Sequence, residues 1–552
     1  MEIIDLLLSR INSFDTEILI KTKNLQIKNS NFRLIIQQIQ EYLNHNGYST
    51  KDTIILYQNN NLFVSIFSIS LVILGIPFVI VNDNFSEADL KNIKTNLINT
   101  FLILNDSEII EIIKRIVIND EQSNEEIQIQ NKISNSDIAY YVHTSGSTGT
   151  SKLVPNTRYG LFNLVSCKQL NFIKNDDIIL QYATPTFDAF IFECFISVCH
   201  KAILAIPDTS IKLDIVELAD FIEEEKITTT LLIPQLTRQL INFADKLSHL
   251  KNLIVGADFF PAELARTIQE KLPNINVYNA YGPSENAVIT LIYKVDYIND
   301  NWSSIPLGQP LDNVEIELLE SDIDNNIFEL IIKSKTLFPG YMKEGQFVLP
   351  NNCDKGFYRT GDLVFQKDNQ IFFYSRNDNQ RKINGFRVDL IQVTNCLCDI
   401  TNCNCVVDVL KGKNDVLVGI IETKDNFDIS SLRNKMGKVL KQYMIPSEFI
   451  YLESFPTTKN GKIDRKKILE DLQNKYQNKA DSFLMILKKY SLDNQYAANL
   501  FEIGITSLQL IDMISELQSI YNIKISIGRL IESPTIANLI SIMNNQGLNI
   551  QL

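Results

Sequence analysis

A loop of small and hydroxylic residues behind an apolar run is the feature that most constrains this chain. Residues 138–142 form the apolar run and predict a short buried strand. Glycines let a backbone approach a ligand closely, hydroxyls and main-chain N–H groups donate to phosphate oxygens, and a lysine adds positive charge. The sequence therefore predicts a polyphosphate-binding turn. Its residues are Thr144, Ser145, Gly146, Ser147, Thr148, Gly149, Thr150, Ser151 and Lys152.

The spacing of this turn separates it from the common P-loop, which needs a glycine directly before its lysine. Here Ser151 stands before Lys152. On this stretch alone a flexible Ser/Gly spacer remains the alternative, because such loops also connect domains without binding a ligand. The choice between a binding turn and a spacer therefore depends on the rest of the chain.

Alternating helical and strand patterns extend from the N-terminus to about residue 374 and are typical of a layered α/β domain. Beyond a polar joint the elements become shorter and more charged, and the last part is helical throughout. Buried strands are expected at residues 53–57, 78–81, 100–104, 178–182 and 230–233, and helices at residues 1–14, 32–44, 215–225 and 261–272. We expect three domains, at residues 1–377, 378–472 and 480–552.

The apolar stretch at residues 62–81 is about as long as a membrane span needs to be. Gly75, Ile76 and Pro77 interrupt it, and proline inside a helix is costly. We expect a buried helix to Leu74, a turn, and a buried strand over residues 78–81. A membrane span is the alternative that this interruption disfavours, so we expect no membrane partner.

Charge and cysteine usage limit the class of protein. The chain has 552 residues and a formal net charge of −13, which argues against nucleic acid or an anionic membrane as the main partner. The first residues lack the basic stretch and the small-residue cleavage site of a signal peptide. Eight cysteines without the framework of a small secreted domain indicate a reducing, cytoplasmic location.

Four of the cysteines are close in sequence, at Cys396, Cys398, Cys403 and Cys405. A structural zinc site usually has two to four residues between paired cysteines, and one residue is tighter than that. We therefore interpret these thiols as small apolar side chains on two buried stretches, with zinc binding as the alternative.

Five further stretches carry chemistry-bearing residues in a fixed order. They are Phe-Asp-Ala-Phe at 187–190, Asn-Ala-Tyr-Gly-Pro-Ser-Glu at 279–285, Tyr-Arg-Thr-Gly-Asp-Leu at 358–363, Gln-Arg-Lys-Ile-Asn-Gly-Phe-Arg at 380–387 and Asn-Gly-Lys-Ile-Asp-Arg at 460–465. Together with the turn at 144–152, they resemble the adenylation domains of nonribosomal peptide synthetases, which are adenylate-forming enzymes. The resemblance covers nearly all of residues 30–470.

The resemblance implies two half-reactions. A substrate carboxylate attacks the α-phosphate of ATP, which gives an acyl adenylate and pyrophosphate, and a thiol then displaces AMP. A carboxylate is already ionised at neutral pH, so the first step needs no general base. The four histidines form no nucleophile–base pattern in the sequence, which fits a reaction driven by positioning and charge stabilisation.

By resemblance, the turn at residues 144–152 holds the β- and γ-phosphates of ATP. Asp362 accepts hydrogen bonds from the ribose hydroxyls with help from Arg376, and Glu285 holds Mg²⁺, which prefers carboxylate oxygen. Lys462 reaches the substrate carboxylate and the α-phosphate, where charge builds in the transition state. A solvated charge or a turn residue is the alternative for each. The positions expected near the adenine are Asn279, Ala280, Tyr281, which stacks on the base, and Gly282.

The same resemblance implies a pocket in which Asp188 pairs with the α-amino group of the substrate. A surface-loop aspartate is the alternative, since Asp is mostly exposed. The other lining positions are apolar or small, so we expect an apolar amino acid with an aromatic or large aliphatic side chain. A pocket resolves one methylene by only about 1–3 kcal/mol, so Phe, Trp, Leu and Ile stay unseparated. Those positions are Ala189, Phe192, Leu231, Ile254, Gly256, Ala280, Val288 and Ile289.

Residues 500–510 resemble the attachment site of peptidyl carrier domains. The resemblance implies that Ser507 carries 4′-phosphopantetheine, which a separate phosphopantetheinyl transferase adds. An apolar helical pattern follows Ser507, and a helix N-terminus favours the phosphodiester charge. The family usually has Asp or His where Thr506 stands. A serine N-cap on an ordinary helix is the alternative.

The implied fold is α/β: a large adenylate-forming N-terminal domain, a small mobile α+β C-terminal subdomain, and a four-helix carrier bundle. We expect a ligase that activates an apolar amino acid with ATP and Mg²⁺ and loads it on the arm at Ser507. The small subdomain is expected to swing about Asp378 between the half-reactions. The expected partners are the amino acid, the transferase, and downstream synthetase or tailoring enzymes.

Several positions depart from the family pattern. Leu153, Ser375 and Phe328 stand where the family has glycine, and residues 391–393 replace an acidic stretch. Two other functions therefore stay open. A coenzyme A ligase with a helical tail is one, although Asp188 and the stretch around Ser507 argue against it. A catalytically inactive docking scaffold is the other.

Overall fold

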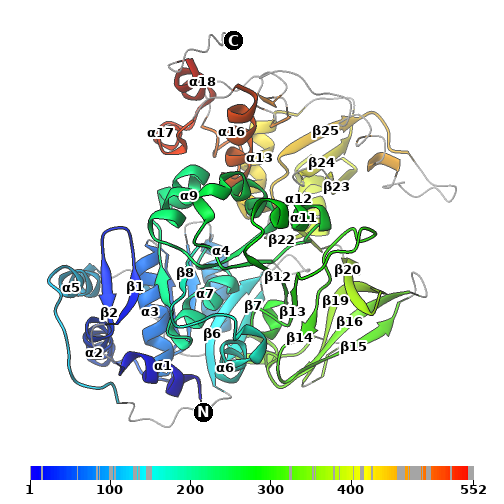
Figure 1. Cartoon of the computed structure of the whole chain (residues 1–552). Helices are drawn as coiled ribbons and strands as arrows, with labels where there is room; N and C mark the ends of the chain where they lie inside the picture. Colours follow the sequence, from blue (N-terminus) through cyan, green and yellow to red (C-terminus); the bar gives the residue numbers. More distant parts are fainter. Residues whose placement is uncertain are drawn as a thin grey trace. The chain divides into compact units, whose positions relative to one another are not determined.

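The structure is a computed structural model that describes residues 2–544 with gaps. The gaps are residues 14–16, 59, 83–84, 86, 98–102, 105–106, 129–133, 135–136, 145–151, 322–325, 351–352, 355, 377–379, 384–385, 402, 411–415, 424–426, 457–466, 470–471, 473–485, 488, 491, 493–498 and 522–524. The chain divides into two units. Figure 1 colours the ribbon by position in the sequence, so the residue ranges of each unit can be followed in it. The first comprises Met1–Thr144, Ser151–Lys212 and Val216–Asp378, and the second consists mainly of Asn379–Leu552.

The larger sheet of the first unit has nine strands among the described residues, in the order β14-β13-β12-β11-β10-β8-β9-β1-β2. The strands are β1 (Ile18–Lys21), β2 (Gln26–Lys28), β8 (Ile178–Leu180), β9 (Ile203–Ala205), β10 (Thr229–Leu232), β11 (Asn252–Gly256), β12 (Asn276–Tyr281), β13 (Leu291–Lys294) and β14 (Gln309–Pro310). Strands β8 to β12 pair with one another in parallel, so their carboxyl ends meet at one edge of the sheet.

Helices connect these parallel strands, as parallel pairing requires. They are α7 (Asp188–Cys199), α8 (Thr209–Leu213), α9 (Ile215–Glu224), α10 (Pro234–Leu240) and α11 (Ala262–Lys271). The strands expected at 178–182 and 230–233 and the helices expected at 215–225 and 261–272 are confirmed to within two residues at each end. Continuous apolar runs and amphipathic periods therefore located the elements that carry this edge.

The second sheet of the first unit has seven described strands, in the order β18-β17-β7-β6-β4-β3-β5. They are β3 (Ile54–Tyr57), β4 (Phe78–Val81), β5 (Ile103–Leu104), β6 (Ile138–Thr144), β7 (Lys152–Thr157), β17 (Tyr341–Lys343) and β18 (Gln346–Val348). The expected strand at 138–142 is confirmed as the first part of β6. Strands β6 and β7 are antiparallel neighbours, and Thr144 pairs with Lys152 across them.

Helix α3 (Asn61–Leu74) settles how the long apolar stretch folds. The Asn60 side chain caps its start by accepting from the main-chain N–H groups of Leu62 and Phe63, at 2.9 and 3.3 Å. Gly75 ends it in the left-handed conformation with φ of 77°. The expected helix, turn and strand are confirmed. In the part of the chain that the structure describes, no helix has the length and hydropathy of a bilayer span.

The other helices of the first unit complete its layers (Figure 1). They are α1 (Ile3–Ile11), α2 (Asn29–His45), α4 (Glu87–Asn96), α5 (Ser107–Ile118) and α6 (Arg158–Ser166), with short 3₁₀ turns η1 (Lys168–Leu170), η2 (Ile241–Leu247) and η3 (Ser284–Asn286). Helix α7 contacts α1, α3, α6, β8 and β9. Because it is buried on all sides from Phe190 to Val198, it forms the centre of the apolar core.

An antiparallel sheet of four described strands completes the first unit. The strands are β15 (Val314–Glu320), β16 (Ile327–Ser334), β19 (Phe357–Lys367) and β20 (Gln370–Arg376). Glu329 of β16 pairs with Arg359 of β19, and its Oε1 accepts from the N–H of Gly361 at 3.2 Å. This ion pair fixes the part of β19 that precedes Asp362.

The described part of the second unit contains two smaller sheets and six helical segments whose first and last residues are assigned. The strands are β21 (Gln380–Ile383), β22 (Phe386–Asp389), β23 (Cys405–Leu410), β24 (Val416–Glu422) and β25 (Glu448–Leu452). The helices are α12 (Leu390–Thr401), α13 (Ile429–Gly437), η4 (Gln442–Met444), α16 (Ser507–Tyr521), α17 (Ile527–Glu532) and α18 (Ile536–Asn544). The clustered cysteines lie in α12 and around the start of β23, where Cys396 and Cys405 belong to the apolar core and Cys398 and Cys403 pack against it.

Candidate functional site

The apolar positions expected to line a pocket lie together in the first unit. Phe192 of α7, Leu231 of β10 and Ile254 of β11 belong to one buried cluster, and Ala189 packs against it. Strand pairing explains this arrangement, because Leu231 pairs with Ile254 across β10 and β11. The remaining members from the expected set are Ala280, Val288 and Ile289.

Gly256 lies beside Ala280 at the carboxyl end of β11. The two residues pair across β11 and β12, and a Cβ atom on Gly256 would lie 2.9 Å from the carbonyl oxygen of Ala280. Glycine at this position is therefore needed for the close approach of two strands. The sequence placed Gly256 only among the apolar or small lining positions of the expected pocket.

Asp188 is the first residue of α7 and is half-buried. Its Oδ2 accepts a hydrogen bond of 2.5 Å from the hydroxyl of Ser284, which lies 96 positions later in the chain. Burial and the negative charge of Asp188 raise the pKa of the Tyr140 hydroxyl, so that tyrosine is neutral beside the carboxylate. The carboxylate thus lies at the margin of a dry region, where charge attracts a cation more strongly than in water.

A buried polar network holds the segment that leads to Asp188. Glu193 accepts from the N–H of Ala183 at 3.1 Å and from Nε2 of Gln181 at 3.0 Å. The Lys212 ammonium donates to Oε1 of Gln181 at 2.7 Å. Burial raises the pKa of Glu193, and the positive charge of Lys212 opposes that shift. The network anchors residues 181–183 just beyond the carboxyl end of β8.

Tyr281, Asp362 and Arg376 form a second cluster in the first unit. The Tyr281 hydroxyl donates to Oδ2 of Asp362 at 2.5 Å, and Nη1 of Arg376 donates to Oδ1 at 2.5 Å. Asp362 and Arg376 pair directly across β19 and β20. Burial and the charge of Asp362 raise the pKa of Tyr281, which keeps its hydroxyl a donor. The sequence placed all three at a nucleotide but did not predict that they bond to one another.

Asn279 has its side chain fixed on the other side of β12 from Ala280. Its Nδ2 donates to the carbonyl oxygens of Ile305 and Pro306, at 3.3 and 2.8 Å. Successive residues of a strand point to opposite faces, so Asn279 and Tyr281 share one face while Ala280 faces the apolar cluster. One short strand thus supplies residues to both expected subsites.

Glu285 of η3 is fully buried, and its Oε1 accepts a 2.7 Å hydrogen bond from the hydroxyl of Tyr341. A carboxylate oxygen is the hard ligand that Mg²⁺ prefers, so this residue fits the expected metal role by its chemistry. Lys152 lies close by, with Nζ 4.5 Å from the centre of the Tyr341 ring. Tyr341 and Ser284 are the residues here to which the sequence assigned no role.

Several expected site residues lie outside the described residues. These are the turn residues Ser145, Gly146, Ser147, Thr148 and Gly149, the hinge residue Asp378 and the catalytic lysine Lys462. The described ends of the turn are Thr144 and Lys152, which pair across β6 and β7. Gly282 is described, and a Cβ atom there would lie 2.2 Å from the carbonyl oxygen of Val288.

Ser507 is exposed and is the first residue of helix α16. The residue before it makes a capping box: Thr506 Oγ1 accepts from the N–H of Gln509 at 3.2 Å, and Gln509 Oε1 accepts from the N–H of Thr506 at 2.9 Å. The N-cap is therefore Thr506. The alternative interpretation of Ser507 as the cap of an ordinary helix does not hold.

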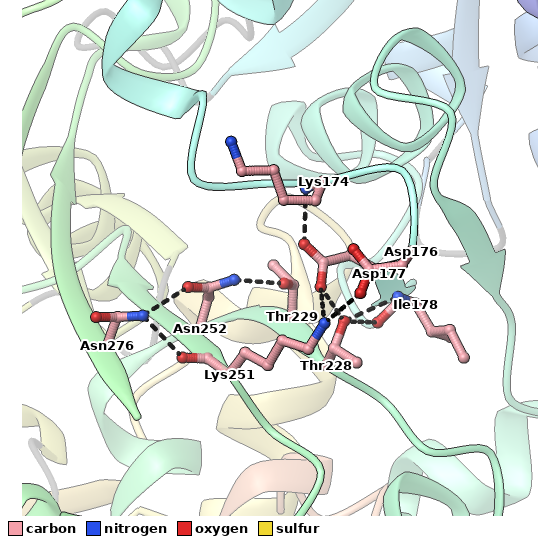
Figure 2. A network of polar contacts seen from close by, with 9 residues as sticks. All are labelled: Lys174, Asp176, Asp177, Ile178, Thr228, Thr229, Lys251, Asn252 and Asn276. Carbon is pink, nitrogen blue, oxygen red and sulfur yellow. Dashed lines mark hydrogen bonds and ion pairs between the residues drawn. The ribbon is translucent and has the colours of Figure 1, made fainter. Parts of the chain in front are cut away.

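The opposite edge of the nine-stranded sheet carries a different polar network, shown in Figure 2. Buried Asp177 accepts from the hydroxyl of Thr228 at 2.7 Å and from the N–H of Lys174 at 2.8 Å. The Lys251 ammonium contacts both Asp176, at 2.7 Å, and Asp177, at 3.4 Å. These residues precede β8, β10 and β11, so the network ties the amino ends of parallel strands together.

Comparison with known proteins agrees with the motifs. Residues 30–342 match the family model described as AMP-binding enzyme, and residues 490–542 match the one described as phosphopantetheine attachment site. The chain is 29% identical to malpinin synthetase of Mortierella alpina over 449 residues, which are 73% of this chain and 6% of that protein. It is also 29% identical to gramicidin S synthase 2 of Brevibacillus brevis over 435 residues, which are 73% of this chain and 10% of that protein. The chain thus spans only a small part of the length of the curated relatives that it matches.

Solved structures show the same fold. One is NpsA-ThdA of Klebsiella oxytoca, an artificially fused adenylation–PCP didomain, with a TM-score of 0.67 and 20% identity over 82% of this chain and 94% of that one. Another is holo-PA1221, described as an NRPS protein containing adenylation and PCP domains, with a TM-score of 0.73 and 18% identity over 96% of this chain and 93% of that one.

Proposed function

Because the chain belongs to the AMP-binding enzyme family and also carries a phosphopantetheine attachment domain, we propose that it activates an apolar amino acid and transfers it to an arm on Ser507. The observation that carries the amino acid assignment is the half-buried Asp188 at the margin of an apolar cluster. An ammonium group satisfies such a carboxylate, and the cluster accepts a side chain without polar atoms. A fatty or aryl acid offers no partner for that charge.

The amino acid side chain is proposed to be aromatic or large aliphatic. Among the lining positions, Phe192, Leu231, Ile254, Val288 and Ile289 are apolar and buried, so a polar side chain would lose its hydration there without gaining hydrogen bonds. The hydroxyl of Ser284 already bonds to Asp188. We infer that it orients the carboxylate toward the amino group.

The nucleotide side of the proposal uses the second cluster. Asp362 is held by Tyr281 and Arg376, so its side chain is oriented to accept from two ribose hydroxyls. Thr144 and Lys152 bracket the turn proposed for the phosphates. Mg²⁺ on Glu285 neutralises phosphate charge when it is bound.

The chemistry then needs positioning more than acid–base catalysis. An oxygen of the amino acid carboxylate attacks the α-phosphorus, and the bond to the bridging oxygen breaks with release of pyrophosphate. Lys462 is proposed to stabilise the charge at that phosphorus, and a swing about Asp378 is proposed to admit the arm. The thiol sulfur of the arm on Ser507 then attacks the acyl carbon and forms a thioester. The bond from that carbon to the phosphate oxygen breaks, AMP leaves with the electron pair, and the thiol proton passes to solvent.

Amino-acid-dependent exchange of pyrophosphate into ATP tests this proposal. Across the common amino acids, we expect the highest rate with one of Phe, Trp, Leu or Ile. A panel in which Asp, Lys or Ser is best would contradict the apolar assignment. Transfer to free coenzyme A that outpaces transfer to the chain itself would favour a coenzyme A ligase, and no exchange with any acid would favour a docking scaffold.

The carrier part has its own test. After treatment with a phosphopantetheinyl transferase and coenzyme A, the intact mass should rise by one arm, and Ser507→Ala should abolish the rise. Ser533, which is also exposed but lies outside the capped start of α16, is the matched control as Ser533→Ala. An unchanged wild-type mass would contradict the carrier assignment.

A further inference from the structure

Tyr341 connects two residues on the nucleotide side that come from distant parts of the chain. Strand β17 lies beside β7 in the seven-stranded sheet, and Met342 pairs with Leu153 across them. Because the two strands are antiparallel, Tyr341 and Lys152 lie diagonally across this pair on the same face of the sheet, where their side chains meet. None of the sequence motifs includes residues 341–343, which form β17.

The Tyr341 hydroxyl holds the carboxylate of Glu285. It donates to Oε1 at 2.7 Å, and Glu285 is fully buried. The same chain segment also holds the main chain of Glu285, because the N–H of Phe338 donates to its carbonyl oxygen at 2.9 Å. A hydrogen bond from a neutral donor to a buried carboxylate is among the stronger ones in proteins.

The Tyr341 ring contacts the lysine at the end of the proposed phosphate turn. Nζ of Lys152 lies 4.5 Å from the ring centre, within the range of a cation–π contact. The ring itself is fixed by Phe338, whose ring packs edge-on at 4.9 Å between centres. Burial and the charge of Glu285 raise the pKa of Tyr341, so the hydroxyl keeps its proton at neutral pH.

The turn into β17 is built to deliver this side chain. Gly340 has φ of 128°, a conformation that residues with a side chain rarely adopt. A Cβ atom at Gly340 would also lie 2.9 Å from the carbonyl carbon of Val348 on β18. Glycine here lets the chain turn tightly into the hairpin, and Tyr341 follows at once.

We propose that Tyr341 is a positioning residue that holds Glu285 and Lys152 in one arrangement and so sets the affinity of the chain for Mg²⁺-bound ATP. This inference rests on the proposed function for the use of ATP. It assigns Tyr341 no contact with the reacting atoms. Its effect passes through two side chains, so it appears in nucleotide affinity and not in amino acid affinity.

The test is binding of ATP to the full chain at fixed Mg²⁺ without any amino acid. Tyr341→Phe keeps the ring and loses the hydroxyl, and we expect the Kd for ATP to rise about tenfold, the size typical of a hydrogen bond to a charged group. Tyr341→Leu loses the ring as well and should weaken binding several-fold more. Tyr374→Phe removes the hydroxyl of a tyrosine that is 52% exposed on β20, and it should leave the Kd unchanged.

A double-mutant cycle separates positioning from general damage. Glu285→Gln removes the negative charge that accepts the Tyr341 hydrogen bond. In that variant, adding Tyr341→Phe should change the Kd for ATP by less than about twofold. Additive effects of the two substitutions would overturn the inference, and so would an unchanged Kd in Tyr341→Phe. In exchange assays the KM for ATP should rise in Tyr341→Phe while the KM for the amino acid stays constant.

The binding test also separates this inference from the function on which it rests. A chain that exchanges pyrophosphate normally while Tyr341→Phe binds ATP as well as wild type would overturn the inference alone. A chain whose ATP affinity falls in Tyr341→Phe, but which exchanges with no amino acid, would overturn the proposed function and support the inference. A full chain that binds no Mg²⁺-bound ATP overturns both.

Discussion

The two edges of the nine-stranded sheet use polar residues in different ways. At the amino ends of the parallel strands, Asp177, Thr228 and Lys251 bond to one another and to the main chain. At the carboxyl ends, Asp188 and Ser284 form a pair beside an apolar cluster. The first arrangement closes on itself and joins strands. The second presents a charge at the margin of a dry region, which is where ligands bind in open α/β sheets.

The comparison teaches that polarity alone does not identify a site. Both edges contain acidic residues next to hydroxyls, and a count of charges does not separate them. What separates them is the neighbourhood: Lys251 lies against the acids of the amino edge, whereas Asp188 bonds to Ser284 and is followed by Ala189, which packs against the apolar cluster. We therefore expect substitutions at the amino edge to change stability, and substitutions at the carboxyl edge to change activity.

The largest expected effect is on activity, at Asp188. Asp188→Asn keeps the shape and an oxygen acceptor for Ser284 but removes the charge. Loss of a desolvated partner for an ammonium group typically costs about 2–5 kcal/mol, so kcat/KM for exchange should fall by roughly 100-fold or more. Exchange kinetics measure this, and the melting temperature should stay nearly constant.

The matched control lies on the other edge. Asp176→Asn removes the charge of an exposed aspartate and should leave kcat/KM within about twofold of wild type, since surface ion pairs contribute little. A 100-fold loss in that variant, or none in Asp188→Asn, would break the division between the edges.

The next effect is on stability, at Asp177. Asp177→Ala leaves the Thr228 hydroxyl and the Lys174 N–H without their acceptor in a buried place. We expect the free energy of unfolding to fall by about 2–4 kcal/mol, while kcat/KM of the folded enzyme changes little. Urea denaturation followed by exchange assays on the folded protein measures both. A loss of kcat/KM that exceeds the loss of folded protein would contradict the structural role.

A smaller effect is expected at Thr228. Its hydroxyl donates to Asp177 and accepts from the N–H of Ile178 at 2.8 Å, and Thr228→Val removes both bonds without changing the volume. The expected loss is about 1–2 kcal/mol. In the Asp177→Ala background the same substitution should cost less, because the partner is already absent. Equal losses in both backgrounds would show that the two residues act independently.

The smallest effect is on the pH dependence of stability, and it has opposite signs at the two edges. The hydrogen bond from Lys251 lowers the pKa of Asp176, so its stabilisation is present above the unfolded pKa and is lost as the pH falls through the folded value. Burial raises the pKa of Glu193 to about 7 in the folded protein. The free energy of unfolding therefore decreases as the pH rises from the pKa of an unfolded Glu, about 4.3, toward the folded pKa.

Urea midpoints between about pH 3 and 8 measure these slopes. Asp176→Asn should flatten the decline at acid pH, and Glu193→Gln should remove the decline between about pH 4 and 7. If the two substitutions changed the pH dependence of the urea midpoint in the same direction, the electrostatic difference between the two edges would be contradicted.

Sequence reasoning located the elements well where one local signal decided the structure. The run at residues 78–81 is apolar throughout and became β4, and Gly75 ended the helix before it. The motifs selected Asp188, Glu285 and Asp362 by residue type and order, and the roles assigned to them stay predictions. Periodicity did not predict the antiparallel sheet of β15, β16, β19 and β20, because half-exposed strands such as β15 carry charges between the apolar residues.

The contacts between motifs were beyond the sequence. Asp188 meets Ser284 and Tyr281 meets Asp362 across 96 and 81 positions, and only the tertiary packing of separate elements brings them together. The sequence placed Gly256 only among the small lining positions. In the structure, a Cβ atom at this position would lie too close to the carbonyl oxygen of Ala280. The turn at residues 145–149 and Lys462, on which the catalytic assignment also depends, remain predictions.

The capping box at Thr506 has a consequence for the arm itself. Because Thr506 and Gln509 form the capping box at the start of α16, the cap is Thr506 and not the serine that follows it. Attachment of the proposed arm at Ser507 would therefore leave both capping-box bonds in place, and the bare and loaded forms could share one backbone. Any enzyme that must tell a loaded carrier from a bare one has to sense the cargo, since the helix beneath it stays the same.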